Sequence, residues 1–252
     1  MYSMKKIYYL IFLIFIFSCT TYQIKDQQST SKTITIDTTI KNDDNVDKWI
    51  MKYKTSLDSL MDLVIGFNKI SMIKNTPESN LGNFVCDLIL DFINRELKDT
   101  LEGLPCIVVL NNGGFRSSLP EGQISIRDIY SVMPFDNTLT LLKISGENMI
   151  KLAQQIIEKG GMPIGGIEII ATATTLKQTK INGNDISKNQ QYWVATSNFI
   201  ANGGDNLIGL MNPIKRIDTP YLIRDIIIEH YKLLTSQNKA AYAEKDGRIR
   251  YE

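Results

Sequence analysis

Residues 107–116 read IVVLNNGGFR, and this stretch decides what kind of fold the chain can form. The first four residues are apolar and mostly β-branched, which predicts a short buried strand. The six that follow are rich in Asn and Gly, so neither a strand nor a helix is expected to continue through them. Glycines let a backbone turn sharply and bring its N–H groups close to a ligand. Arg116 adds a planar fork that suits a phosphate or a carboxylate.

Outward from this strand, helix and strand patterns fill residues 47–252 without a repeat or an interior linker. Apolar residues at helical spacing predict helices over residues 49–65, 81–97, 146–158 and 222–234, and a short helix is expected at 125–130. Alternating or short apolar runs predict further strands at 138–144, 167–173 and 192–197. Residues 246–248 are expected to belong to a polar tail. The pattern predicts one α+β domain over residues 47–252.

Two further loops, MPFDN and SNFIANGGD, carry side chains suited to a ligand. Phe135 and Asn137 lie two residues apart on a bend fixed by proline, and Phe199 precedes Asp205 across a Gly-Gly turn. Together with Arg116, two rings, an amide and a carboxylate fit a nucleotide: the rings could stack on the base, and the charged groups could meet ribose and phosphate. Each residue also has an ordinary interpretation, as core, turn, solvated charge or helix cap.

The composition narrows the classes of function. Lys and Arg total 28 against 27 Asp and Glu, so no long-range field attracts DNA or RNA, and we expect no nucleic-acid partner. Histidine occurs once, whereas a mono- or dinuclear hydrolase site with imidazole ligands usually needs two or more. We therefore expect no metal or other cofactor to be bound by this chain alone.

Residues 1–18 have the pattern of a secretory signal. Lys5 and Lys6 precede an apolar run over residues 7–17, which is short for a membrane span but has the length of a signal peptide. The end of this run resembles the lipobox of bacterial lipoproteins, which implies lipidation of Cys19. We expect a protein anchored by lipid in the bacterial cell envelope, at the outer membrane or the periplasmic face. An ordinary signal peptide with an incidental cysteine is the alternative.

Residues 19–46 are polar and contain few large apolar groups, so they are expected to form a flexible tether. The alternation at residues 32–37 leaves open a single edge strand there. The two other cysteines, Cys86 and Cys106, lie in apolar surroundings, where a buried free thiol is the commoner outcome. A disulfide between them is the alternative, because the expected compartment permits disulfides.

Six ordered motifs relate the chain to a known family. They are ESNLGN at 78–83, NNGGFR at 111–116, the stretch 122–128, PFDN at 134–137, the strand and helix start at 142–152, and the stretch 199–205. In this order they resemble the C-terminal, substrate-binding domain of the 5′-nucleotidase family, which includes periplasmic UDP-sugar hydrolases and surface 5′-nucleotidases. The resemblance implies a single four-layer α/β/β/α domain that binds the nucleoside part of the substrate.

The resemblance assigns residues to the base. Phe135 and Phe199 resemble the two rings that sandwich it, and Asn137 resembles the amide at its edge. Gly166 resembles the backbone position that touches the base.

It also assigns residues to the sugar and the phosphate. Asp205 resembles the carboxylate that holds the ribose hydroxyls, and Asn111 and Arg116 resemble the pair facing ribose and phosphate. The family commonly has arginines just before ESNLGN, where this chain has only Lys74, a point charge in place of a bidentate fork.

Family enzymes also have an N-terminal metallophosphoesterase domain, and its D-x-H and G-N-H motifs do not occur here. The lone His230 is expected to be a surface or partly packed residue. The resemblance therefore implies the substrate-binding half of a split 5′-nucleotidase, with divalent metals on a separate metallophosphoesterase chain. One alternative is a non-catalytic surface lipoprotein that captures nucleotides or nucleosides, and another is an interaction scaffold with a vestigial pocket.

Overall fold

The computed structural model describes residues 31, 33–37 and 40–252. The expected signal peptide and Cys19 lie outside the described residues. Residues 33–37 contain no strand, so the edge strand considered for that stretch is not present there. Within the described part of the chain, no helix has both the length and the apolar character needed to cross a bilayer. The chain divides into two units, Met1–Trp49 and Ile50–Glu252, and the second contains both sheets described below.

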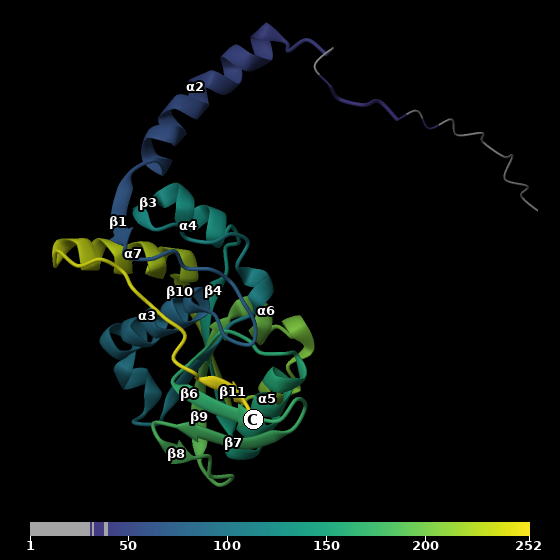
Figure 1. The fold of residues 1–252 in the computed structure, drawn as a ribbon, viewed down its shortest axis with the longest axis vertical. Coiled ribbons are helices and arrows are strands. Elements are labelled where there is room, and N and C mark those ends of the chain that lie inside the picture. The colour runs from purple at the N-terminus through teal and green to yellow at the C-terminus, as the bar shows by residue number, and fades with distance from the viewer. Residues whose placement is uncertain (1–30, 32, 38–39) are drawn as a thin grey trace, which may run out of the picture. The chain divides into compact units, whose positions relative to one another are not determined.

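A five-stranded sheet forms the centre of the second unit (Figure 1). Its strands, in spatial order, are β10 (Lys215–Leu222), β4 (Thr138–Ser145), β9 (Gln191–Ser197), β2 (Cys106–Val109) and β5 (Ile164–Gly165). β9 pairs antiparallel with β4 and parallel with β2. The strands β2, β4 and β9 expected from the sequence are all present, and each is buried on both faces over most of its length.

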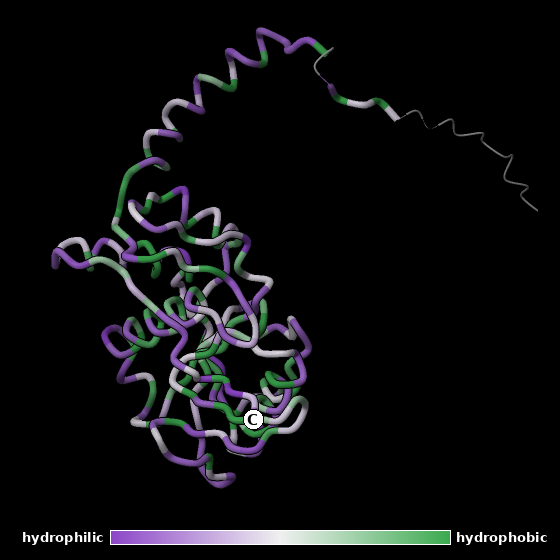
Figure 2. The backbone as a smooth tube through the Cα atoms, viewed as in Figure 1, coloured by the Kyte–Doolittle hydropathy of each residue, from purple (hydrophilic) through white to green (hydrophobic). Residues whose placement is uncertain are grey.

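Side chains alternate between two hydrophobic cores on the two faces of this sheet. One core contains helices α3 (Asn80–Glu96) and α7 (Ile223–Ser236), and the other contains helix α5 (Gly146–Glu158). A four-stranded sheet also contributes to the second core; its order is β11 (Ile249–Tyr251), β6 (Ile167–Ala171), β7 (Leu176–Ile181), β8 (Asn184–Asp185). Figure 2 shows the hydrophobic stretches gathered where these elements meet. The predicted α+β class is confirmed.

The expected helices α3 and α5, and the short helix α4 (Ile126–Val132), begin at serines that cap them. At α4 the cap is reciprocal, since the Ser125 side chain accepts from the Asp128 backbone while the Asp128 carboxylate accepts from the Ser125 backbone at 2.8 Å. Such caps satisfy backbone N–H groups that the first helical turn leaves without partners.

The helix expected over residues 49–65 differs from the structure at its end and in its burial. Helix α2 (Asp44–Met61) stops earlier, and strand β1 (Val64–Asn68) follows, paired with β3 (Gly122–Ser125). The backbone of residues 64–68 pairs with β3 instead of continuing the helix, and at Gly66 it lies against the Tyr231 ring, with no room for a Cβ. None of the residues of α2 is buried, so its apolar spacing did not indicate a packed face.

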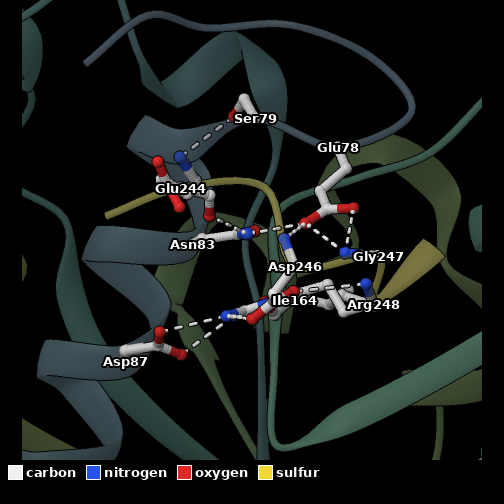
Figure 3. Close-up of polar contacts among 10 residues, drawn as sticks. Glu78, Ser79, Asn83, Asp87, Ile164, Glu244, Asp246, Gly247 and Arg248 are labelled. Carbon is white, nitrogen blue, oxygen red and sulfur yellow. Dashed lines mark hydrogen bonds and ion pairs between the residues drawn. The ribbon is translucent and has the colours of Figure 1, made fainter. Parts of the chain in front are cut away.

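The tail expected at residues 246–248 instead forms a polar network around the buried Arg248 side chain (Figure 3). The Arg248 guanidinium, 8% exposed, donates from Nε and Nη2 to Asp246 at 3.0 and 2.6 Å. It also donates from Nη1 and Nη2 to Asp87 at 2.9 and 3.0 Å, and from Nη1 to the Ile164 carbonyl at 2.8 Å. All five N–H groups of the guanidinium therefore have acceptors, which is what a buried charge requires.

A second buried side chain, Glu78, holds the same segment from the other side (Figure 3). Its carboxylate accepts from the Asn83 side chain at 2.7 Å and from the backbone N–H groups of Asp246 at 2.8 Å and Gly247 at 3.1 Å. With Arg248, this contact directs β11 alongside β6 in parallel register. The first and last residues of ESNLGN thus act in folding, by joining α3 to the C-terminal strand.

Cys86 and Cys106 are free thiols, so the alternative of a disulfide between them is not realised. Cys86 is fully buried on α3, and burial raises its pKa far above the ordinary value. Burial likewise raises the pKa of Cys106 to about 12. Neither thiol is an activated nucleophile, because nucleophilic attack requires the thiolate.

We expect Arg248→Met to lower the free energy of unfolding by about 2–3 kcal/mol, since it removes five charge-assisted hydrogen bonds while leaving the buried Ile164 carbonyl without its donor. Arg250→Met is the matched control: Arg250 is 50% exposed and meets Glu168 only at 3.8 Å, so the change should stay below about 0.5 kcal/mol. Urea denaturation measures both. Equal effects of the two substitutions would contradict the assigned role of Arg248.

Candidate functional site

One cavity of about 350 Å³ brings together most of the residues singled out in the sequence. Its lining comprises Asn111, Gly113, Gly114, Phe135, Asn137, Phe199 and Asp205. The volume falls within the range of small-molecule sites, and such sites combine apolar walls with a few polar groups in this way. Five of the seven predicted substrate-binding residues therefore share one cavity.

The register of the central sheet explains this convergence. Leu139 near the start of β4 pairs with Ser197 at the end of β9, and β2 runs parallel to β9. The loop before β4 and the loops after β9 and β2 consequently open at the same edge of the sheet. Segments that lie more than 80 residues apart in the sequence become neighbours there.

The Phe199 ring is held by the backbone around it. Phe199 lies in the one-turn helix α6 (Asn198–Ala201), whose N-terminus is capped by the Ser197 side chain. Gly204 is in direct contact with the ring, and a Cβ at Gly204 would lie 2.6 Å from the Phe199 Cδ1 atom. Asp205 follows with φ at 58°, a left-handed conformation that turns the chain back at the cavity.

The Phe135 ring is half exposed, at 48%, as is Phe199 at 49%. Large apolar rings exposed in one cavity provide surface for a flat ligand. Arg116 does not line the cavity; its guanidinium lies 6.0 Å from the centre of the Phe135 ring. Lys74 donates to the Phe115 carbonyl at 3.0 Å, so both cations lie at the NNGGFR turn.

Gly166 is not brought to this cavity. It lines a different one of about 400 Å³ together with Asp87, Lys180 and Arg248. Its φ is 73°, and a Cβ there would lie 3.0 Å from the Cys106 carbonyl oxygen, which accounts for glycine at this position. Close packing against β2 therefore explains why residue 166 is a glycine.

Sequence reasoning did not single out Gly204, although it determines where the Phe199 ring can lie. The sequence signals were the Gly-Gly pair, which is also typical of ordinary turns, and its place in the stretch 199–205 that resembles the family. Gly113 and Gly114 were noted as part of NNGGFR, and the structure places both in the wall of the cavity.

His230, the one histidine in the sequence, is packed as a side chain of the core edge. Its ring meets Phe84 edge-on with centroids 5.7 Å apart. Burial lowers the His230 pKa; Arg95 lowers it further, whereas Asp91 and Glu229 partly oppose the shift. Among the described residues, no three His, Cys, Asp or Glu side chains gather in a way that could hold a metal ion.

Comparisons with known proteins point to the same domain. The family model described as "5′-nucleotidase, C-terminal domain" matches residues 64–211. The trifunctional nucleotide phosphoesterase protein YfkN of Bacillus subtilis is 26% identical over 248 residues, covering 90% of this chain and 16% of that protein. Human 5′-nucleotidase is 24% identical over 238 residues, covering 85% of this chain and 40% of the human protein.

Solved structures agree in fold. The 5′-nucleotidase precursor of Thermus thermophilus superposes with a TM-score of 0.69 at 24% identity, over 82% of this chain and 43% of that one. Haemophilus influenzae NAD nucleotidase superposes with a TM-score of 0.58 at 22% identity, over 83% of this chain and 41% of that one. The chain therefore spans less than half the length of each of these relatives.

The packing of His230 predicts a pH dependence of stability. The folded-state pKa lies below the ordinary 6.5, so the unfolded chain binds the proton more readily as pH falls through 6.5. The free energy of unfolding should therefore fall as the pH drops through that window. In a His230→Phe variant this part of the slope should vanish. Urea denaturation at closely spaced pH values tests this, and an unchanged slope would contradict it.

Proposed function

This chain belongs to the 5′-nucleotidase C-terminal domain family, and we propose that it is the nucleotide-binding half of a split 5′-nucleotidase whose catalytic domain is carried by another chain. The observation that carries the proposal is the cavity in which the half-exposed rings of Phe135 and Phe199 accompany Asn137 and Asp205. The two aromatic rings suit the flat faces of a base, the amide suits the edge of the base, and the carboxylate suits the sugar hydroxyls.

Each lining group has a defined task in this proposal. The two rings stack on the base, and the Asn137 amide donates to and accepts from its edge. The Asp205 carboxylate accepts from the ribose hydroxyls, assisted by Asn111. Arg116, next to Phe135 but outside the cavity wall, remains for a phosphate that projects from the nucleoside. Gly166 has no task here, because it lines the other cavity.

Hydrolysis of a phosphate ester requires an activated water and stabilisation of the developing charge. The packing of His230 against Phe84 supports the proposal that divalent metals for this step come from a separate metallophosphoesterase chain. A signal sequence and lipidation at Cys19 would place this chain on the envelope surface, which a lipid-anchored partner would share. Such confinement raises the effective concentration, so that a weak interface suffices.

Phe199→Ala should weaken adenosine and AMP binding by about 1–3 kcal/mol, or roughly 5- to 150-fold in Kd, because one stacking face is lost. Phe67→Ala is the matched control, since Phe67 is equally exposed, at 49%, but lies on β1 away from the cavity. Isothermal titration calorimetry measures both. Identical affinities of wild type and Phe199→Ala would contradict the proposed pocket.

A double-mutant cycle separates the ring from its support. Gly204→Ala alone should weaken binding, since the new Cβ displaces the Phe199 ring. In the Phe199→Ala background the same change should cost less, because only the contact of the new Cβ with the backbone carbonyl oxygen of residue 199, at 2.6 Å, remains. Additive losses would show that Gly204 acts by some route other than the ring.

Hydrolysis of AMP and UDP-sugars with Mn²⁺ or Zn²⁺ tests the split enzyme itself. The purified chain should be inactive alone and active when mixed with its metallophosphoesterase partner, and Phe199→Ala should raise the KM of the mixture. Activity of the chain alone would contradict the proposal. Nucleotide binding without activity in the mixture would instead favour a capture lipoprotein.

A further inference from the structure

Two arginines on one continuous segment each hold one of the two ring-bearing loops. Arg216 lies on β10, Arg224 lies in the first turn of α7, and only seven residues separate them. We propose that Arg216 and Arg224 are positioning residues that set the gap between the Phe135 and Phe199 rings. This inference rests on the proposed function, because it concerns how that site accepts a base.

Arg216 anchors the loop of Phe199. Its Nη1 donates to the Ala201 carbonyl at 3.2 Å, and its Nη2 donates to the Asn202 side chain at 2.8 Å. Ala201 and Asn202 end helix α6, where backbone carbonyls lack helical partners and a cation is favourable. Asp218 holds the guanidinium itself, accepting from Nε at 2.9 Å and from Nη2 at 2.9 Å.

Arg224 anchors the loop of Phe135. Its Nη2 donates to Asp136, the next residue after Phe135, at 2.7 Å. The guanidinium carbon lies 4.0 Å from the centre of the Tyr130 ring on α4, a stacked cation–π contact. The Arg224 side chain is 7% exposed, whereas that of Asp136 is 79% exposed. The position of Arg224 is therefore fixed by burial, and its ion pair with Asp136 holds the exposed loop.

The segment that carries both arginines is bonded to strand β4. β10 pairs with β4 from Lys215 to Asp218, and the Thr219 hydroxyl donates to the Leu139 carbonyl of β4 at 2.7 Å. The backbone N–H of Ile223 then donates to the Asn137 carbonyl at 2.9 Å. The two guanidinium groups are therefore placed relative to one another by β4, and the loops they hold inherit that spacing.

Spacing matters because a flat base fills the gap between two rings only when each face is in van der Waals contact. Two contacts of about 3.5–4.0 Å require the rings to be roughly 7–8 Å apart. A loop that drifts by a fraction of that distance loses stacking on one face without unfolding. Gly204 and the Ser197 cap fix the Phe199 ring within its loop, but the position of each loop as a whole depends on its contacts with the rest of the fold, here Arg216 and Arg224.

The test uses one variant for each loop. Arg216→Gln releases the Phe199 loop, and Asp136→Asn releases the Phe135 loop while leaving the buried Arg224 in place. Glu229→Gln is the matched control, because it removes a charge from an exposed ion pair with Arg95, at 3.1 Å, elsewhere on α7. Binding is measured by titrating adenosine, and stacking is measured by the upfield ring-current shift of the adenine H2 and H8 proton signals.

For each loop variant the adenosine Kd should rise about five- to tenfold, as expected for the loss of one charge-assisted anchor. The upfield shift at saturation should shrink, and the melting temperature should match that of Glu229→Gln. If both loop variants keep the wild-type Kd and the wild-type ring-current shift, the inference is wrong while the proposed function stands. Absence of adenosine binding by the wild-type chain would overturn the proposed function and the inference with it.

Discussion

The antiparallel pairing of β4 with β9, from Leu139 opposite Ser197 to Ser145 opposite Gln191, is the constraint on which the rest of the structure depends. Both strands are buried on both faces, so a slip of one residue would exchange the two cores. The same register brings the loop before β4 and the loop after β9 to one edge of the sheet. Core and cavity therefore follow from a single alignment of two strands.

The second sheet depends on a different kind of interaction. Its strand β11 is held by the buried charges of Glu78 and Arg248, each with its acceptors or donors supplied. Buried charged groups tolerate little variation in geometry, because any unpaired group would carry its full desolvation cost. The network thus gives the C-terminal segment one defined position on α3. Asp87 and Arg248 of this network line the cavity that contains Gly166, not the cavity of the Phe135 and Phe199 rings.

Prediction from sequence succeeded where local physical chemistry decides. Strands β2, β4 and β9, the serine-capped helices α3, α4 and α5, and the ring, amide and carboxylate side chains were identified, and five of the seven predicted binding residues share one cavity. It failed where distant residues decide. The first two residues of β1, Val64 and Ile65, were taken for the end of a helix, since the strand β3 that pairs with β1 and the Tyr231 ring at Gly66 come much later in the sequence. The segment at Arg248 was taken for a polar tail because Asp87 and Glu78 are equally remote.

The α+β class, the ordered motifs of the family and the chemical types of the predicted binding residues could all be read from the sequence. These follow from side-chain identity and from spacing along the chain, both of which are local properties. Only the tertiary structure decided that Gly166 lies in another cavity, that Glu78 serves folding, and that Arg216 and Arg224 hold the ring-bearing loops. Those roles depend on strand pairing between segments far apart in the chain, and no local pattern specifies it.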